Sequence, residues 1–424
     1  MPYYDEIEVR IWPPEELDPV LVGQVWFRET ETSFIYDPTY LCRENAISVY
    51  GADLPLGPEE IRMGGPMTLA PSLRDALPDL WGRRSIAAAF RFRGHDPYRG
   101  RDIDEFTVAT QAGPDRIGAL DLRPPGHKML IKKDERPSLE DLMALADLIE
   151  ADKEVEDGEL WDLIAHCLFA GGARPKALYT DAAGRKFIAK FTAEGDAYPV
   201  VAAEFVAMRL AALAGIDVAP VEIVNIGRRE ILLVERFDRV AHLDGGWGRR
   251  AMVSALTWTQ ESELAAHHIS YPQLAGIIAN SFEDAPMALE ELFTRVVFNI
   301  LVGNTDDHAR NHSAFWNGRT HELTPAYDIA PQRRTSREAN QAMILSAGLR
   351  AAQLSNAAAI ASVFGVDQLQ FARIVDRQVG TIASHWIDVC DEAGLSRNER
   401  AAFAGRQFFN DYAFEGVRTT PVLF

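Results

Sequence analysis

Residues Leu301–Ala330 read LVGNTDDHARNHSAFWNGRTHELTPAYDIA, and three polar side chains within them carry the main prediction for this chain. Asp306 is followed five positions later by Asn311, and Asp328 comes directly after Pro-Ala-Tyr. Enzymes that transfer phosphoryl groups use one carboxylate to orient the attacking hydroxyl, and an amide with a second carboxylate to hold magnesium. The pattern therefore predicts a magnesium-dependent kinase.

The same stretch contains two histidines that suggest a metal hydrolase as an alternative to a kinase. His312 stands four residues after His308, so on a helix both imidazoles would share one face, as in some metal hydrolases. A segment rich in Asn, Asp and Thr favours a turn over a helix, however, and Ala309 stands where such a hydrolase needs glutamate. We therefore favour a structural role for His308, which fixes the loop.

Composition limits the remaining possibilities. The chain has 424 residues, so we expect two or three structural units, and its net charge of −19 disfavours direct binding to nucleic acid. No apolar run approaches the roughly 18 residues that a membrane span needs, and the N-terminus lacks a signal-peptide pattern. Cys42, Cys167 and Cys390 are too widely spaced to suggest a disulfide framework or a zinc site. We expect a cytoplasmic protein that does not associate with membranes.

The N-terminal part is predicted to be rich in β-strands. Apolar and polar residues alternate over 7–11, and further strand patterns follow at 20–27 and 34–36, which together predict a small antiparallel sheet. We expect a helical passage over 73–92 and a strand over 115–121. Residues 139–158 are typical of an acidic amphipathic helix followed by a polar linker. We therefore expect a domain boundary near 150–160.

Residues 161–240 resemble the small lobe of a kinase. Lys190 lies in the predicted strand KFIAKF, and Glu204 lies in the following helix between Ala203 and Phe205. A lysine paired with a helical glutamate positions the α- and β-phosphates in kinases, although a lone lysine after an apolar run is more often a surface residue.

Two further segments of this lobe allow two interpretations each. Residues 171–176, GGARPK, could cradle phosphate with backbone amides, with Arg174 and Lys176 adding charge, or could form only a tight hairpin. Residues 232–238, LLVERFD, could be a hinge that binds adenine near Glu235 and Phe237, or an edge strand that runs into a turn. Beyond residue 250 the apolar periodicity is helical, most clearly over 287–304, 369–390 and 395–412.

The complete set of motifs resembles the HipA family of bacterial toxin kinases. The matching stretches are GGARPKA, FIAKF, AAEFVAMRLAALAGI, LLVERFDR, NTDDHARNHSAF and LTPAYDIAP, with VGQVWF, FIYDPTYL, LPDLWGR and DRIGALDLRP in the N-terminal part. The resemblance covers nearly the full length. It implies an α+β, protein-kinase-like bilobal fold, with a HipA-like N-terminal subdomain at 1–155, a small lobe at 156–240 and a helical large lobe at 241–424.

The resemblance also implies roles for individual residues. Asp306 would be the catalytic base, with Lys190 and its ion-pair partner Glu204 completing the catalytic set. Asn311 and Asp328 would hold Mg²⁺. The residues that would bind ATP are Gly172, Ala173, Arg174, Lys176, Lys190, Glu235, Phe237, His308, Asn311 and Asp328.

Members of this family phosphorylate serine or threonine on a cytosolic protein, aminoacyl-tRNA synthetases among them, which arrests growth and favours persistence. The resemblance therefore implies a HipB-like helix-turn-helix antitoxin as partner, with DNA bound only through that partner. A small-molecule kinase and a catalytically silent binding partner or co-repressor are the alternatives.

One departure from the family concerns regulation. A serine before the glycine turn is often autophosphorylated in the family and silences the kinase, but Phe169 stands at that position, and no Ser or Thr occurs over 139–179. We therefore expect restraint by a partner or by another phosphosite, such as Thr335 or Ser336. Mass spectrometry after incubation with ATP and Mg²⁺ tests this expectation, and phosphate on Tyr179 would contradict it.

Overall fold

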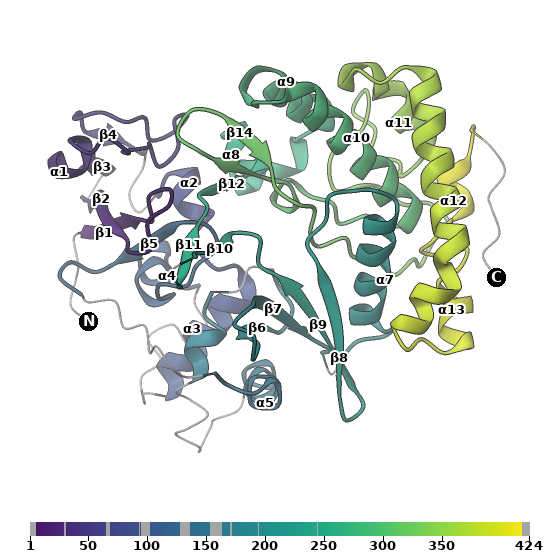
Figure 1. Ribbon diagram of the computed structural model, residues 1–424, viewed down its shortest axis with the longest axis horizontal. Coiled ribbons are helices and arrows are strands. Elements are labelled where there is room, and N and C mark those ends of the chain that lie inside the picture. The colour runs from purple at the N-terminus through teal and green to yellow at the C-terminus, as the bar shows by residue number, and fades with distance from the viewer. Residues whose placement is uncertain are drawn as a thin grey trace. The chain divides into compact units, whose positions relative to one another are not determined.

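The computed structural model describes residues 6–28, 31–64, 68–92, 94, 102–127, 136–152, 163–169, 172–193, 195–243 and 245–417 (Figure 1). The chain forms two compact units. Unit 1 comprises Met1–Glu194, Leu233–Val253 and Phe315–Arg319, and unit 2 comprises Gly195–Leu232, Ser254–Ala314 and Thr320–Phe424.

Unit 1 begins with the predicted antiparallel sheet. Its five strands, in the spatial order β4-β3-β2-β1-β5, are β1 (Glu6–Ile11), β2 (Val20–Phe27), β3 (Thr32–Tyr36), β4 (Ile61–Arg62) and β5 (Leu120–Arg123). Ile7, Val9 and Ile11 are fully buried, so the period-two pattern marks the core face of β1, and the prediction is confirmed.

The α-helices described in the first 152 residues are α1 (Pro38–Leu41), α2 (Pro71–Arg74), α3 (Leu80–Phe92), α4 (Glu105–Gln111) and α5 (Leu139–Glu150). The passage over 73–92 is two helices instead of one, because Pro78 cannot continue a helix begun at Pro71. The strand predicted over 115–121 is confirmed only for Leu120 and Asp121, where β5 begins, and is wrong for 115–119. Gly118 adopts φ +76°, outside the range of a strand, and the preceding residues bind other segments through their side chains.

A second sheet of four strands follows, in the order β6-β7-β9-β8. Its strands are β6 (Lys176–Thr180), β7 (Lys186–Phe191), β8 (Val221–Ile226) and β9 (Arg229–Glu235), and the short helix η1 (Leu163–His166) precedes them. Strands β6 and β7 pair antiparallel with Lys176 opposite Lys190. Two small sheets complete the β-structure: β10 (Arg239–Ala241) with β11 (Trp247–Arg249), and β12 (Met252–Ser254), β13 (Ser313–Trp316) and β14 (His321–Leu323) in that order.

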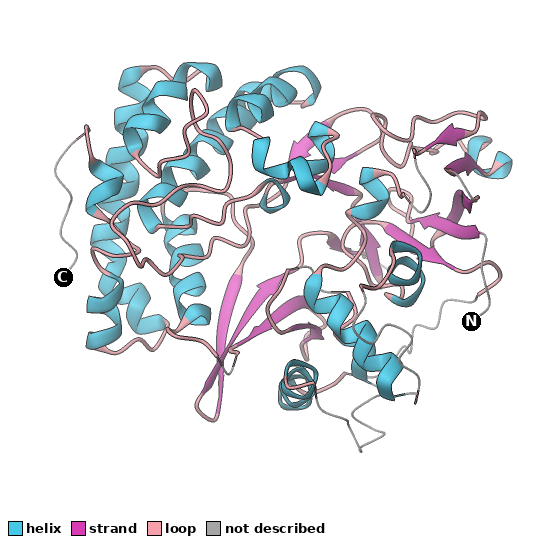
Figure 2. Cartoon of the chain, turned by 180° about the vertical axis from the view of Figure 1, so that it is seen from behind, coloured by secondary structure: helices cyan, strands magenta, loops and turns pink. Residues whose placement is uncertain are grey.

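Unit 2 is mainly helical (Figure 2). Its helices are α7 (Val200–Leu213), α8 (Ala255–Thr259), η2 (Glu263–His268), α9 (Tyr271–Ser281), α10 (Ala285–Val302), η3 (Ala309–Asn311), α11 (Leu354–Ile360), η4 (Ala361–Phe364), α12 (Gln368–Glu392), α13 (Arg397–Phe403) and η5 (Asp411–Phe414). Helix α12 packs against both α7 and α10. No helix in the described ranges has the length and apolar character needed to cross a membrane.

Helix α10 supports the segment that carries the predicted catalytic residues. Helices α9, α11 and α12 cover the apolar face of this helix. That face consists of two buried rows, which are Leu292, Val296 and Ile300, and Phe293, Val297 and Leu301. Asp284 caps the helix by accepting the Met287 amide at 3.1 Å, and Gly303 ends it at φ +70°. The helix predicted over 395–412 is wrong beyond Phe403, since Gly405 and Phe409 both have positive φ.

Candidate active site

The segment after α10 is fixed to the end of that helix. A Cβ atom on Gly303 would lie 2.6 Å from the backbone oxygen of Gln407, so only glycine fits there. The backbone amide of the buried Asn304 donates to the Asn299 carbonyl at 2.9 Å, and its side-chain amide donates to Asn299 Oδ1 at 3.0 Å. The predicted catalytic residues therefore begin from a fixed point.

Residues 305–311 form a tight turn. The His308 amide donates to the Asp306 carbonyl, and the Asn311 amide donates to the His308 carbonyl, each at 2.8 Å. Asn311 Nδ2 also donates to the Asp306 carbonyl at 3.2 Å. The segment contains only the single 3₁₀ turn η3, so the helix that would place His308 and His312 on one face does not form. The hydrolase alternative therefore loses its geometric basis.

A buried network lies behind this turn. Asp307 is 2% exposed, accepts a hydrogen bond from Tyr271 Oη and lies 2.9 Å from His312 Nε2. Burial alone would raise the pKa of Asp307, but His312 and the Tyr271 hydroxyl lower it below its usual range. Burial and the Asp307 charge raise the pKa of Tyr271 well above its usual value, so the phenol keeps its proton and donates. Sequence analysis missed Tyr271, which lies 36 residues from Asp307.

The next segment brings Asp328 near Asp306. Asp328 has φ +57°, an unusual conformation for aspartate that is frequent at functional sites. Tyr327 fixes this segment, because its hydroxyl donates to the Arg310 carbonyl at 2.6 Å. Desolvation raises the pKa of Asp306, the carboxylates of Asp328 and Asp307 raise it further, and His308 opposes them.

The cluster of Asp306, Asn311 and Asp328 lies within unit 2, and Asp306 is exposed to solvent. Its concentrated negative charge and amide oxygen suit a hard divalent cation such as Mg²⁺, which prefers oxygen ligands and retains several waters. Among the described residues, no group of three or more His, Cys, Asp or Glu side chains could hold a metal by itself. The cluster fits a cation that takes its remaining ligands from phosphate and water.

The described part of the glycine turn, residues 172–176, lies in unit 1 and is not a hairpin. Residues 167–169 before it form a turn, whereas a hairpin would require a strand there. Gly172 has φ +82° and, like Ala173, is exposed. A Cβ atom on Gly172 would lie 2.5 Å from Lys176 Nζ, so the ammonium group lies against the turn. Arg174 is half-buried, and Gly171 lies outside the described residues.

Lys190 and Glu204 occupy the predicted elements. Lys190 is half-buried on β7 in unit 1, and Glu204 is 4% exposed on α7 in unit 2. Burial of a carboxylate within an apolar helix requires a partner, which fits the predicted role of Glu204. The ion pair between the two side chains stays a prediction.

The predicted hinge leaves the interior of a sheet. Strand β9 ends at Glu235 and lies between β7 and β8, so the edge-strand interpretation is wrong. Glu235 and Phe237 are half-buried, and the Phe237 ring packs edge-on against Phe315 with centroids 5.9 Å apart.

The residues that alternate with Glu235 and Phe237 are buried in an ionic cluster. Arg236 donates to both oxygens of Asp238, and to Asp115 Oδ1 at 2.9 Å, while Arg239 pairs with the same two carboxylates. Burial by itself would raise the pKa of Asp238, but the two guanidinium groups lower it to about 2. Gly118 joins the cluster by donating its amide to Asp238 at 2.8 Å. The cluster was not predicted from the sequence. The alternation in ERFDR, in which Arg236 and Asp238 are buried and alternate with half-buried residues, is the pattern that could have indicated it.

Comparison with known proteins identifies the family. A model of the HipA-like C-terminal domain matches residues 168–386, slightly more than half of the chain, and a model of the HipA N-terminal domain matches residues 16–123. The chain belongs to the HipA family. The toxin-kinase resemblance seen in the sequence motifs is thereby confirmed at the level of the family.

Curated HipA relatives match over part of their length. The serine/threonine-protein kinase toxin HipA of Shewanella oneidensis is 32% identical over 30% of this chain and 33% of its own length. The putative kinase Y4mE of Sinorhizobium fredii is 32% identical over 29% of this chain and 30% of its own. The chain thus spans about a third of the length of these two relatives.

A solved structure extends the likeness in fold. The complex of S. oneidensis HipA with HipB and its operator DNA contains a chain with a TM-score of 0.69 and 20% identity, over 94% of both chains. At this identity the likeness concerns the fold, and the predicted α+β, HipA-like fold is confirmed.

Proposed function

We propose that this HipA-family chain is a toxin serine/threonine-protein kinase that transfers the γ-phosphate of ATP to a protein hydroxyl. The proposal rests mainly on the proximity of Asp306, Asn311 and Asp328. A tight turn holds Asn311 against the Asp306 carbonyl, and Asp328, with its positive φ, lies near Asp306. This is the donor set of phosphoryl-transfer sites. The name of the S. oneidensis relative supports the serine/threonine class.

In the proposed mechanism, Asp306 accepts the hydrogen bond of the substrate hydroxyl and orients it for in-line attack. Asn311 and Asp328 would hold Mg²⁺, which would supply positive charge to neutralise the phosphates. His308 supports the turn through its backbone hydrogen bonds to Asp306 and Asn311. The hydroxyl proton passes toward Asp306 as the bond to the γ-phosphorus forms and ADP leaves.

A second set of residues would bind the nucleotide. Lys190 would contact the α- and β-phosphates, with Glu204 as its ion-pair partner. The amide of Ala173 and the charges of Arg174 and Lys176 would contact phosphate beside Gly172, and Glu235 and Phe237 would line the adenine site. We propose the functional division 1–155, 156–240 and 241–424 for the N-terminal subdomain, the small lobe and the large lobe.

We also propose that a HipB-like helix-turn-helix antitoxin restrains the kinase in the cytoplasm and carries any DNA contact. The solved S. oneidensis complex of HipA, HipB and operator DNA supports this partner, and the net charge of −19 argues against direct DNA binding. An aminoacyl-tRNA synthetase is the candidate substrate. Thr335 and Ser336 are exposed, as the alternative regulatory phosphosites must be.

Calorimetric titration of ATP, with Mg²⁺ and with EDTA, tests the metal-binding part of the proposal. Mg²⁺ should tighten binding at least about tenfold in the wild type, and Asp328→Asn should abolish that gain, because the variant loses a charged metal ligand. Asp388→Asn, at an exposed carboxylate on α12, is the matched control and should retain the gain. An unchanged Mg²⁺ dependence in Asp328→Asn would refute the assigned metal ligand.

A further inference from the structure

Two residues at the start of α3 hold the glycine turn. We infer that Asp79 and Trp81, from the N-terminal region, are positioning residues that fix residues 172–176 in the conformation that binds phosphate. The inference rests on the proposed function, since it assigns these residues to the nucleotide site. It gives the N-terminal region an indirect part in ATP binding, through the glycine turn.

Three hydrogen bonds connect this region to the turn. The Gly172 amide donates to Asp79 Oδ2 at 2.7 Å, and the Trp81 amide donates to the Gly172 carbonyl at 3.0 Å. Trp81 Nε1 donates to the Lys176 carbonyl at 2.7 Å. Both backbone groups of Gly172 are therefore bound, and the turn is held at both ends of its described part.

Trp81 is a rigid support for these bonds. Its side chain is fully buried and lies on a 13-residue helix. An indole has only one hydrogen-bond donor, and here that donor binds the first residue of β6. Movement of the turn away from α3 would leave a buried N–H group without its partner, which is costly.

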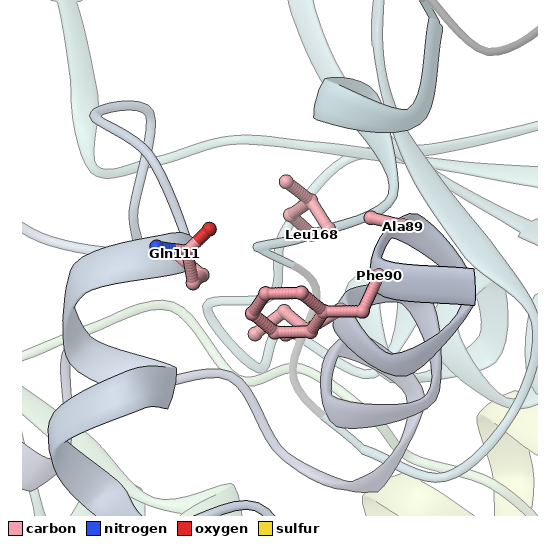
Figure 3. Close-up of a pocket in the computed structure, with 5 residues that line it drawn as sticks. Ala89, Phe90, Gln111 and Leu168 are labelled. Atoms are coloured by element: carbon pink, nitrogen blue, oxygen red, sulfur yellow. The ribbon is translucent and has the colours of Figure 1, made fainter. Parts of the chain in front are cut away.

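The segment just before the turn is fixed by packing. Phe169 is buried against Ala112 and Leu178, and a Cβ atom on Gly113 would lie 2.8 Å from its ring. Leu168 lies at a small pocket between α3 and α4, beside Phe90 and Gln111 (Figure 3). Phe169 thus packs at the C-terminal end of α4, and Leu168 lies beside α3, whose first residues hold the turn.

Ala173 can then offer its amide to phosphate. It is exposed, and the Lys176 ammonium lies beside the neighbouring Gly172. Because Asp79 and Trp81 bind the backbone from α3, the turn is already ordered before nucleotide arrives. Preorganisation of this kind lowers the entropy cost of binding.

Alanine at position 79 tests the inference. In Asp79→Ala the KM for ATP should rise about tenfold with kcat changed less than twofold, because a hydrogen bond to a charged group is lost from a binding element. Asp79→Asn should restore most of the affinity, since its amide oxygen can accept the Gly172 N–H. Asp104→Ala is the matched control: Asp104 caps α4 by accepting the Thr107 amide at 2.8 Å, and its loss should leave KM unchanged.

Hydrogen exchange without nucleotide provides a readout that does not depend on catalysis. The backbone amides of Gly172, Ala173, Arg174 and Lys176 should exchange about tenfold faster in Asp79→Ala than in the wild type, and Asp104→Ala should not show this change. Unchanged exchange would overturn the inference. A lower KM in Asp79→Ala would also overturn it, because Asp79 would then compete with phosphate for Gly172. Failure of the wild type to bind ATP would instead refute the proposed function, while the exchange comparison would still decide whether Asp79 fixes the turn.

Discussion

Replacing Tyr271 with phenylalanine removes the hydroxyl that donates a hydrogen bond to the buried carboxylate of Asp307. Both residues are at most 2% exposed, so water cannot replace the lost donor. A hydrogen bond to a charged group contributes about 1.5–3 kcal/mol. Because His312 Nε2 remains 2.9 Å from the carboxylate, we expect Tyr271→Phe to lower the free energy of unfolding by about 2 kcal/mol.

A double-mutant cycle measures the interaction itself. Asp307→Asn should cost about 3 kcal/mol, since it removes the buried carboxylate that accepts from Tyr271 Oη and lies 2.9 Å from His312 Nε2. Asp307→Asn combined with Tyr271→Phe should cost about 1–2 kcal/mol less than the sum of the single changes, because both remove the same bond. Urea denaturation at pH 7 provides the measurement. Tyr198→Phe is the matched control, since the Tyr198 hydroxyl donates to a neutral acceptor, the Pro331 carbonyl, at 3.0 Å. The free-energy costs of Tyr198→Phe and Asp307→Asn should simply add in the double variant.

The direction of the pH dependence follows from the lowered pKa of Asp307. A carboxylate whose folded-state pKa is depressed stabilises the protein above its unfolded value of about 3.9, and this contribution is lost as the pH falls through the folded value. The difference between the wild type and Tyr271→Phe should therefore shrink below about pH 4. If the free-energy costs of Tyr271→Phe and Asp307→Asn add to within about 0.5 kcal/mol, the proposed interaction between these two side chains is refuted.

Three other substitutions have expected outcomes. Gly303→Ala should lower the free energy of unfolding by about 2–3 kcal/mol in urea denaturation, since φ is +70° and the new Cβ would lie 2.6 Å from a backbone oxygen. Burial raises the pKa of Asp53 to about 6, so the stability associated with its protonated form is lost as the pH rises through 6. The free energy of unfolding of Asp53→Asn should therefore be about 1–2 kcal/mol higher than that of the wild type at pH 8, and equal to it below about pH 4, as measured by thermal unfolding. A difference that does not change with pH would show that the raised pKa of Asp53 is not its cause. Gly172→Ala should weaken ATP binding about tenfold by calorimetry, because φ is +82° and its Cβ would lie 2.5 Å from Lys176 Nζ.

The parts of the fold that follow a local period could be predicted from the sequence. The alternation over 7–11 predicts the buried face of β1. The apolar periodicity over 287–304 likewise predicts the buried face of α10. The turn at 305–311 was also predictable, because its Asn, Asp and Thr content disfavours a helix. Local composition thus determined both the element types and the placement of three candidate site residues.

The parts that could not be predicted depend on partners far away in the sequence. Residues 115–118 look like a strand in isolation, but Asp115 and Arg116 bind segments more than 100 residues away. The contact between Asp79 and Gly172 spans 93 residues, and no local pattern signals it. The apolar pattern over 395–412 likewise does not reveal that the chain turns at Gly405 and Phe409.

The central claim is that Asp306 orients a protein hydroxyl for transfer of the ATP γ-phosphate. The most direct measurement is transfer from γ-labelled ATP with Mg²⁺ into a lysate of the host's soluble proteins, with the wild type, Asp306→Asn and the control Asp388→Asn. We predict one discrete labelled protein band with the wild type and the control, and none with Asp306→Asn. A band of equal intensity with Asp306→Asn would contradict the claim. Label only in small molecules would indicate a small-molecule kinase, and absence of both transfer and ATP binding would leave a binding-only protein.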